Sequence, residues 1–446
     1  MSDRIQIIDA TRGRTAELDN LCARSLADLG PDVEEQTREI VNRVREYGDQ
    51  ALVEYTRRFD CDSFTAADII VEPDEIQAAY DEVPAEWIGA VRRARENVFE
   101  YHERTMSRSW LDDFDGVYLG QRVTPVASAG ICVPAASASL PSTVWMTVMP
   151  ARAAGVPNVV MVSPPRSDGS IDPIIAVAAG ECGVDEFYRI GGAHAVAALA
   201  YGTETVQSVD LIVGPGNPYV VMAKKMVFGH VNIEALPGPS ESVIIADGSS
   251  SVELTAVDLL SQAEHTGDNT VILITDDEDF AYQVRDETYA QLAQLPRAEL
   301  TTQSLREYGA IVIVADIAAA VQLSNTIAPE HLQLLVPDPL AVLDQIENAG
   351  CIFMGPRSPV ALGDYAAGPS HVLPTNGTAR FSSALSTDHF VKKSSLIYAT
   401  RLGLERLGPD VSRLAESEGL TAHARSVQMR LQADARRSCA DQESGE

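Results

Sequence analysis

Residues 158–200 read NVVMVSPPRSDGSIDPIIAVAAGECGVDEFYRIGGAHAVAALA. Short apolar runs at residues 158–162 and 186–190 alternate here with alanine-rich stretches of helical length. The runs are short enough for buried strands, and the longer stretches between and after them suit helices. This order of strand, helix, strand and helix is typical of a parallel sheet that is covered by helices.

The same alternation continues along the rest of the chain. Further apolar runs lie at residues 209–213, 243–246, 270–274, 310–314 and 351–353. The tetrapeptide Leu236-Pro237-Gly238-Pro239 interrupts both helix and strand and separates two comparable sets of runs. We therefore expect an α/β protein with two Rossmann-like parallel-sheet domains.

The two ends of the chain have a different texture. Apolar residues recur at helical spacing between residues 32 and 106, and helical periodicity returns between residues 409 and 437. We expect an N-terminal helical region and a C-terminal helical tail around the two sheets. The expected boundaries are an N-terminal extension at 1–30, a discontinuous first α/β domain at 31–131 and 241–382, a second Rossmann-like domain at 132–240, and the tail at 383–446.

Length and charge limit the classes of function. A chain of 446 residues can build more than one core. Its formal net charge of −30, from 64 acids and 34 bases, should repel nucleic acid and anionic membranes. The bases include only four lysines, at positions 224, 225, 392 and 393. This composition is typical of salt-adapted proteins, although an acidic protein of an ordinary cytoplasm would also fit.

No signal for export or metal-binding thiolates stands out. The first residues carry acids and bases without an apolar stretch, and no run of 18 uncharged apolar residues occurs. The six cysteines are far apart and form no Cys-x-x-Cys pair. We expect a soluble cytoplasmic protein whose metal, if it has one, is held by His, carboxylate or amide groups.

Residues 262–265, Gln-Ala-Glu-His, form the first candidate site. Gln262 and His265 are three residues apart, late on an expected helix, so both can face one metal ion. Nitrogen and oxygen ligands suit zinc, manganese or cobalt. The alternative is a solvent-facing glutamine and an ordinary surface histidine.

Glu330 and His331 follow Pro329 in the string Ala-Pro-Glu-His-Leu. An imidazole can accept an alcohol proton near neutral pH, and a carboxylate can deprotonate water, so this pair suits proton transfer. A glutamate and a capping histidine at a helix end would explain the same residues.

Three further segments carry weaker signals. Glycine-rich turns at 191–194, which ends in His194, and at 214–217, which ends in Asn217, could bring backbone amides close to a phosphate or could be tight structural turns. Residues 355–378 form a long Gly-, Pro- and Ser-rich loop containing Asp364 and His371, and such loops often carry function. Glu418 and His423 are expected on one tail helix, near the same face.

Taken together, these strings resemble histidinol dehydrogenases. The matching strings occur in the order of that family: Pro-Ser-Glu at 239–241, Ser-Gln-Ala-Glu-His at 261–265, Ala-Pro-Glu-His-Leu at 328–332, Gly-Asp-Tyr at 363–365, His-Val-Leu-Pro-Thr at 371–375 and Leu-Thr-Ala-His at 420–423. The resemblance covers nearly the whole chain. It implies oxidation of L-histidinol to L-histidine with Zn²⁺ and NAD, in a cytoplasmic homodimer with shared active sites and no nucleic-acid or membrane partner.

The resemblance also implies roles for individual residues. The zinc ligands would be Gln262, His265, Asp364 and His423, the last of them supplied by the tail of the partner subunit. His331 would be the base in both oxidations, and Glu330 would activate water. A final group would contact the substrate: Ser240, His371 and Glu418, together with the zinc ligands and the Glu330–His331 pair.

The cofactor side departs from the family pattern. The family usually has Tyr followed by Pro-Gly-Gly where this chain has Cys132 followed by Val133, Pro134, Ala135 and Ala136, and Gln where it has His194. Cys132, His194 and Asn217 are nevertheless the expected NAD contacts. Two rival readings are a paralogue that oxidises another polar alcohol, such as a sulfonated diol, and a catalytically dead binding protein. Glu418 argues against a sulfonate, and the intact Glu330–His331 pair argues against a dead protein.

Overall fold

The computed structural model describes residues 4–13, 15–18, 30–135, 139–265 and 267–443. The chain forms two compact units. Unit 1 comprises Met1–Met106 and Val126–Phe390, and unit 2 comprises Ser107–Pro125 and Val391–Glu446. No helix in the described ranges has both the length and the apolar character needed to cross a bilayer.

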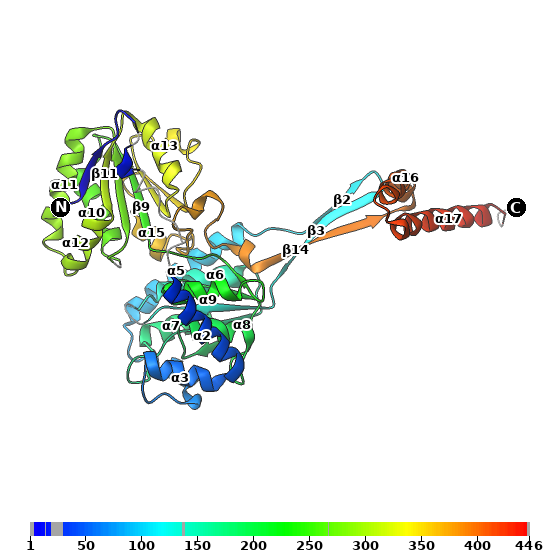
Figure 1. Cartoon of the computed structure of the whole chain (residues 1–446), viewed down its shortest axis with the longest axis horizontal. Helices are drawn as coiled ribbons and strands as arrows, with labels where there is room; N and C mark the ends of the chain where they lie inside the picture. The colour runs from blue at the N-terminus through cyan, green and yellow to red at the C-terminus, as the bar shows by residue number, and fades with distance from the viewer. Residues whose placement is uncertain (1–3, 14, 19–29, 136–138, 266, 444–446) are drawn as a thin grey trace. The chain divides into compact units, whose positions relative to one another are not determined.

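The larger sheet of unit 1 has six parallel strands in the order β1-β11-β10-β9-β12-β13. We call it sheet A. Its strands are β1 (Gln6–Asp9), β9 (Glu241–Ala246), β10 (Thr270–Thr275), β11 (Gly309–Ile313), β12 (His331–Leu335) and β13 (Cys351–Met354). Helices cover both of its faces (Figure 1). On one face lie α10 (Val252–Ala263), α11 (Glu278–Leu292) and α12 (Ala298–Glu307), and on the other lies α13 (Ile317–Ile327).

The second sheet of unit 1 has five parallel strands in the order β6-β5-β4-β7-β8. We call it sheet B. Its strands are β4 (Ser128–Cys132), β5 (Asn158–Val162), β6 (Glu186–Tyr188), β7 (Leu211–Val213) and β8 (Asn232–Ile233). The intervening helices are α6 (Ser142–Ala153), α7 (Pro173–Cys182), α8 (Gly192–Tyr201) and α9 (Pro218–Val227). Almost every residue of α8 is buried, which explains why this helix reads as alanine-rich and apolar all round.

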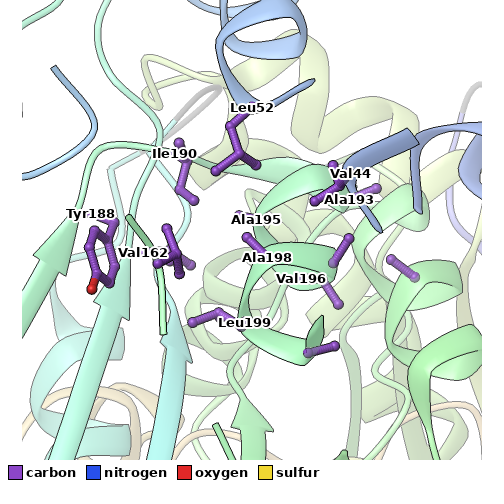
Figure 2. Close-up of a cluster of buried hydrophobic side chains, with 14 of the residues drawn as sticks. Val44, Leu52, Val162, Tyr188, Ile190, Ala193, Ala195, Val196, Ala198 and Leu199 are labelled. Atoms are coloured by element: carbon purple, nitrogen blue, oxygen red, sulfur yellow. The ribbon is translucent and has the colours of Figure 1, made fainter. Parts of the chain in front are cut away.

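The N-terminal helices pack with sheet B. They are α2 (Pro31–Tyr47), α3 (Asp49–Phe59), the 3-10 turn η2 (Ala66–Asp68), α4 (Pro73–Ala79) and α5 (Ala85–Arg104). Figure 2 shows Val44 of α2 and Leu52 of α3 in one apolar cluster with Ala195 and Leu199 of α8. The expected division had placed residues 31–131 with the other α/β domain. An amphipathic helix shows which of its faces is apolar, but its sequence does not show which sheet that face covers.

Short elements between and after the last strands of sheet A complete unit 1. They are α14 (Pro339–Leu343), α15 (Val360–Tyr365) and the 3-10 turns η3 (Thr378–Arg380) and η4 (Thr387–Phe390). The segment 355–378, expected as a loop, therefore contains one short helix, and Asp364 lies in that helix. Residues 6–9, expected in an extension, form strand β1 at the edge of sheet A.

Unit 2 combines an antiparallel sheet with two helices. Strands β2 (Trp110–Phe114), β3 (Val117–Pro125) and β14 (Val391–Ala399) pair in the order β14-β3-β2. Helices α16 (Arg401–Ser417) and α17 (Thr421–Glu443) pack on each other. Large apolar side chains are exposed here, among them Trp110, Leu111, Ile397, Tyr398 and Leu402, with Ile397 76% exposed. The antiparallel sheet was not expected, because strands β2 and β14 lack the buried face that produces an alternating pattern.

Candidate active site

The expected catalytic residues meet at the amino-terminal edge of sheet A. Ser240 immediately precedes β9, and His331 is the first residue of β12, where it pairs with Ser242 of β9 and Cys351 of β13. Helix α10 runs back between two parallel strands, so its last turn, which contains Gln262, reaches the same edge. The fold therefore brings together residues that are up to about a hundred positions apart in the chain.

Glu330 is a buried carboxylate with its own hydrogen-bond donors. Its Oε2 accepts a hydrogen bond from the Glu241 backbone N–H at 3.0 Å and another from the Ser240 side chain. Burial nevertheless raises the pKa of Glu330 to about 7, against the opposing effect of the neighbouring His331. A carboxyl with a pKa near neutrality can both accept and donate a proton at physiological pH.

His331 is held in one orientation by the backbone. Its Nδ1 lies 3.2 Å from the carbonyl oxygen of Glu241, so an Nδ1–H donates there and Nε2 is left to accept a proton. Among the described residues Nε2 has no hydrogen-bond partner, and it lies 3.7 Å from Oδ1 of Asp364. Burial alone would lower the pKa of His331, but the carboxylates of Glu330 and Asp364 raise it to about 9.

Asp364 and His371 lie on either side of a segment that several groups anchor. The Nδ1 of His371 lies 3.0 Å from the carbonyl oxygen of Asp364. The indole N–H of Trp145 donates to the Tyr365 carbonyl at 2.9 Å, and Asn97 donates to the next carbonyl, that of Ala366, also at 2.9 Å. Helices α5 and α6 therefore fix the backbone that carries Asp364.

The groups expected to hold a metal have suitable chemistry. Gln262, His265 and Asp364 offer an amide oxygen, an imidazole nitrogen and a carboxylate, which is a donor set that zinc accepts. Burial lowers the pKa of His265, while the charge of Asp364 raises it and that of His331 lowers it, so these side chains are electrostatic neighbours. The described residues contain no group of three or more His, Cys, Asp or Glu placed to bind a metal, and the expected set has only two such residues in unit 1.

Two details of the metal-ligand segments differ from the expectation. Helix α10 ends at Ala263, so His265 lies just beyond the helix rather than on its last turn. Glu418 is the C-terminal cap of α16, and His423 lies in the first turn of α17, so the prediction that they share one helix is wrong. Gly419, with φ of +74°, reverses the chain between them because glycine adopts this conformation without strain. Both residues are exposed and belong to unit 2, whereas the other candidates belong to unit 1.

The three expected cofactor contacts lie near the carboxyl ends of the strands of sheet B. Cys132 ends β4, His194 lies in the first turn of α8, and Asn217 caps α9 by accepting from the N–H groups of Tyr219 and Val220. Asn217 is exposed, whereas Cys132 and His194 are buried. The remaining family departure at Ala136 lies outside the described residues.

His194 fills an internal position next to helix α3. Its ring lies beside the stacked rings of Tyr55 and Phe59, with centroids 6.0 and 6.4 Å away. Its Nε2 is 3.2 Å from the Thr56 hydroxyl, and burial lowers the pKa of His194 to about 3. In this position the ring is neutral and contributes to packing between α3 and α8.

A buried ion pair beneath the Gly214 turn was missed at the level of sequence. The Lys224 ammonium donates to both oxygens of Glu234 at 2.7 Å and to the Gly214 carbonyl at 2.9 Å. Glu234 in turn accepts from the Gly214 N–H at 2.7 Å. Lys224 follows Val220 by four residues in an apolar helix, and this spacing, which places it on the buried face, was the available signal. The pair fixes the turn that ends in Asn217.

A cavity of about 400 Å³ opens beside the same glutamate. It is lined by Glu234, Phe381, Ser382, Ser383, Ser386, Asp388 and His389. The lining is mainly polar, and it includes the glutamate that accepts from the Gly214 N–H.

Comparisons with known proteins show which family the chain is similar to. The family model for histidinol dehydrogenase matches residues 24–431. A histidinol dehydrogenase of Synechococcus is 46% identical over 429 residues, which cover 96% of this chain and 99% of the relative. One from Syntrophotalea carbinolica is 52% identical over 400 residues, covering 90% and 93%. The crystal structure of histidinol dehydrogenase from Elizabethkingia anophelis superposes with a TM-score of 0.92 at 36% identity, covering 96% of this chain and 98% of that one.

Proposed function

The chain belongs to the histidinol dehydrogenase family of oxidoreductases, and we propose that it oxidises L-histidinol to L-histidine with zinc and two molecules of NAD. Histidinol oxidation in histidine biosynthesis is the activity that the family supports. The buried pair Glu330–His331 beside Asp364 carries the proposal, because it combines two proton acceptors of different chemistry in one site.

His331 is suited to the alcohol oxidation. Nε2 rather than Nδ1 is the nitrogen that can accept a proton, because Nδ1 is engaged by the Glu241 carbonyl, and with a pKa of about 9 the neutral ring that accepts becomes more abundant as the pH rises towards 9. Nε2 would accept the hydroxyl proton as the alcohol is oxidised to the aldehyde, and NAD, when bound, would supply the hydride acceptor. The same nitrogen can accept a proton from the hydrated aldehyde in the second oxidation, which yields the carboxylic acid and a second NADH.

Glu330 is suited to the hydration that lies between the two oxidations. An aldehyde has no hydroxyl proton to lose, so water must add before a second hydride can leave. With a pKa of about 7, the Glu330 carboxylate can take a proton from that water while remaining in place through its bonds to Glu241 and Ser240. The division of labour explains why two adjacent proton acceptors are present.

Gln262, His265 and Asp364 would hold the zinc ion, with His423 as a fourth ligand. Zinc supplies a positive template on which a substrate with an imidazole and an amine is held in place. Ser240, His371 and Glu418 would contact the polar groups of the substrate. The carboxylate of Glu418 suits an amine, and for that reason we prefer histidinol to a sulfonated alcohol.

NAD would lie along the carboxyl edge of sheet B. The Gly214 turn precedes α9, and the positive end of the α9 dipole favours an anion such as a pyrophosphate, while the Asn217 side chain caps the N–H groups of Tyr219 and Val220. The hydrogen bonds of Lys224 and Glu234 to Gly214 hold this turn in place, which supports this placement. Asn217 is the exposed candidate for a direct contact, whereas Cys132 and His194 would act from within the fold.

The test is the stoichiometry of the reaction with and without metal. Purified protein in high salt should form two NADH per histidinol, and removal of divalent metal by a chelator should abolish turnover until zinc is added back. A preparation that contains no divalent metal and keeps full activity would contradict the zinc proposal. One NADH per histidinol, with aldehyde accumulating, would contradict the four-electron reaction.

We further propose a homodimer in which the tail of each chain completes the site of the other. The exposed apolar side chains of unit 2, such as Trp110, Ile397 and Tyr398, are the kind of surface that a second copy covers. A mixed dimer of a His423→Ala chain and a His331→Asn chain tests the exchange. If the tails cross, one site is free of both changes and about half of the wild-type activity per dimer returns. Mixed dimers that stay inactive would contradict shared sites.

A further inference from the structure

One layer below the candidate site, strand β12 carries a buried amide in an apolar environment. Gln333 lies two residues after His331, so both side chains point to the same face of sheet A. This is the face covered by α10, where Ile244, the register partner of Gln333, packs with Leu259 and Leu260. Gln333 is 1% exposed, and its Oε1 has no hydrogen-bond partner among the described residues.

The amide has a single partner, and that partner belongs to the metal-ligand helix. Gln333 Nε2 donates to Oδ2 of Asp258 at 2.6 Å. Asp258 lies on α10 one turn before Gln262, so the two residues share a face of the helix. The hydrogen bond therefore joins the strand that begins with His331 to the helix that ends beside Gln262.

Stability does not explain a polar group at this position. A buried polar atom without a partner destabilises a protein, and a pair of apolar side chains of similar size in place of Gln333 and Asp258 would avoid that penalty. Apolar contacts are not directional, so the contacts of α10 with the sheet allow the helix to shift along the strand. A short hydrogen bond between Gln333 and Asp258 fixes one register of the helix against the strand.

We propose that Asp258 and Gln333 are positioning residues that set the separation between Gln262 and His331. The inference rests on the proposed zinc function, because it concerns the geometry in which Gln262 serves as a ligand. Groups that orient metal ligands typically change metal affinity by about 10- to 100-fold when they are removed. Neither residue contacts the substrate in this scheme, and neither takes part in proton transfer.

The test separates stability from metal binding. The Gln333→Leu protein should bind zinc about tenfold or more weakly and show a higher KM for histidinol with a smaller change in kcat. The double variant Asp258→Leu/Gln333→Leu, which leaves neither partner unpaired, should also bind zinc weakly but melt at the wild-type temperature or above it. Zinc affinity is measured on the metal-free protein by competition with a chromophoric chelator, so this readout does not depend on turnover. The control is Ser324→Ala on α13, on the other face of sheet A. It removes a buried hydroxyl that, like Gln333 Oε1, has no hydrogen-bond partner among the described residues.

Exchange of the two partners provides the second measurement. Asp258→Asn keeps an oxygen acceptor and should bind zinc nearly as well as wild type. Gln333→Glu places two carboxylates together and should bind weakly, whereas the double variant Asp258→Asn/Gln333→Glu restores the hydrogen bond with the donor reversed and should recover. Wild-type zinc affinity in Gln333→Leu, or no recovery in the double variant, would overturn the inference. A wild-type protein that binds no zinc would overturn the proposed function as well.

Discussion

The two parallel sheets of unit 1 carry their candidate residues at opposite ends of their strands. In sheet A the site forms at the amino edge, where Ser240 precedes β9 and His331 begins β12. In sheet B it forms at the carboxyl edge, where Cys132 ends β4 and Gly214 follows β7. Ligands of open α/β sheets usually bind at carboxyl ends, so sheet B follows the general rule and sheet A does not.

Buried ionisable pairs also differ in role between the two edges. In sheet B the buried Lys224 and Glu234 neutralise each other and hold a backbone turn. In sheet A the buried Glu330 and His331 have pKa values moved towards or beyond neutrality, and their protons can be exchanged with a bound molecule. We infer that the edge of sheet A performs proton transfer and that the edge of sheet B provides a rigid surface for the cofactor.

The largest expected effect is the loss of the base at the sheet A edge. His331→Asn should slow both the alcohol and the aldehyde oxidation by about 10²- to 10⁴-fold, the usual contribution of a general base. Glu330→Gln should slow the aldehyde-to-acid half far more than the alcohol half. Single-turnover traces that start from histidinol and from histidinal distinguish the two halves, and equal losses in both halves for Glu330→Gln would refute the division of labour.

At the sheet B edge, the expected effect of a single change is on folding. Lys224→Met leaves the Glu234 carboxylate buried without its cation and should reduce the free energy of unfolding by about 3–5 kcal/mol. Denaturant titration measures this change. Lys225→Met is the matched control, because the neighbouring Lys225 is exposed. The double variant Lys224→Met/Glu234→Leu should recover most of the loss, and a double variant as unstable as the single one would contradict the assignment.

The next effect concerns His194 beside sheet B, and it is small near neutral pH and grows as the pH falls. Burial lowers the pKa of His194 in the folded protein to about 3, whereas an unfolded histidine has a pKa near 6.5. Only the unfolded chain then binds the proton, so the contribution of His194 is complete above pH 6.5 and is lost as the pH falls towards 3. The loss is about 1.4 kcal/mol per pH unit. In His194→Gln the free energy of unfolding should fall less steeply with pH below 6.5. The control His230→Gln, which changes an exposed histidine, should keep the wild-type slope. An unchanged slope in His194→Gln would contradict a neutral buried ring.

Much of this architecture was predictable from the sequence. The run at 158–162 coincides with β5, and the other six runs overlap observed strands, because a strand buried on both faces is a short continuous apolar run. Strand β12 was not predicted, since it begins with His331 and contains Gln333, and those polar residues mask its apolar positions. The Glu330–His331 pair was found through adjacency in the chain, which needs no structure.

The contacts that position the site were not predictable in the same way. Asp258 and Gln333 are 75 positions apart, and each alone reads as an ordinary polar residue. The anchoring of Asp364 by Trp145 and Asn97 joins segments that are more than 200 residues apart. Whether such distant residues come into contact depends on the register of the strands that carry them or flank them. That register depends on pairing across the whole sheet rather than on local sequence.

The last prediction concerns the carboxyl edge of sheet A, which the site leaves unused. Asp247 and Asp276 follow β9 and β10 there, and Asp316 caps α13 beyond β11. Partial burial, followed by the charges of Asp247, Asp277 and Asp316, raises the pKa of Asp276. Its carboxylate is therefore less stable in the fold than in the unfolded chain, and above its folded pKa the ionised form lowers stability.

Asp276→Asn should thus raise the free energy of unfolding by about 0.2–0.5 kcal/mol in dilute buffer. The gain should vanish in molar KCl, where the screening length falls to about 3 Å. The exposed turn residue Asp62, replaced by Asn, is the control that should show no such gain. The same titration tests salt adaptation, because a chain with a net charge of −30 should also melt at a higher temperature as KCl is added. If the wild-type melting temperature were the same in dilute buffer and in molar KCl, self-repulsion would not limit its stability, and a gain from Asp276→Asn that persisted in molar KCl would have to come from desolvation rather than from the charges at this edge.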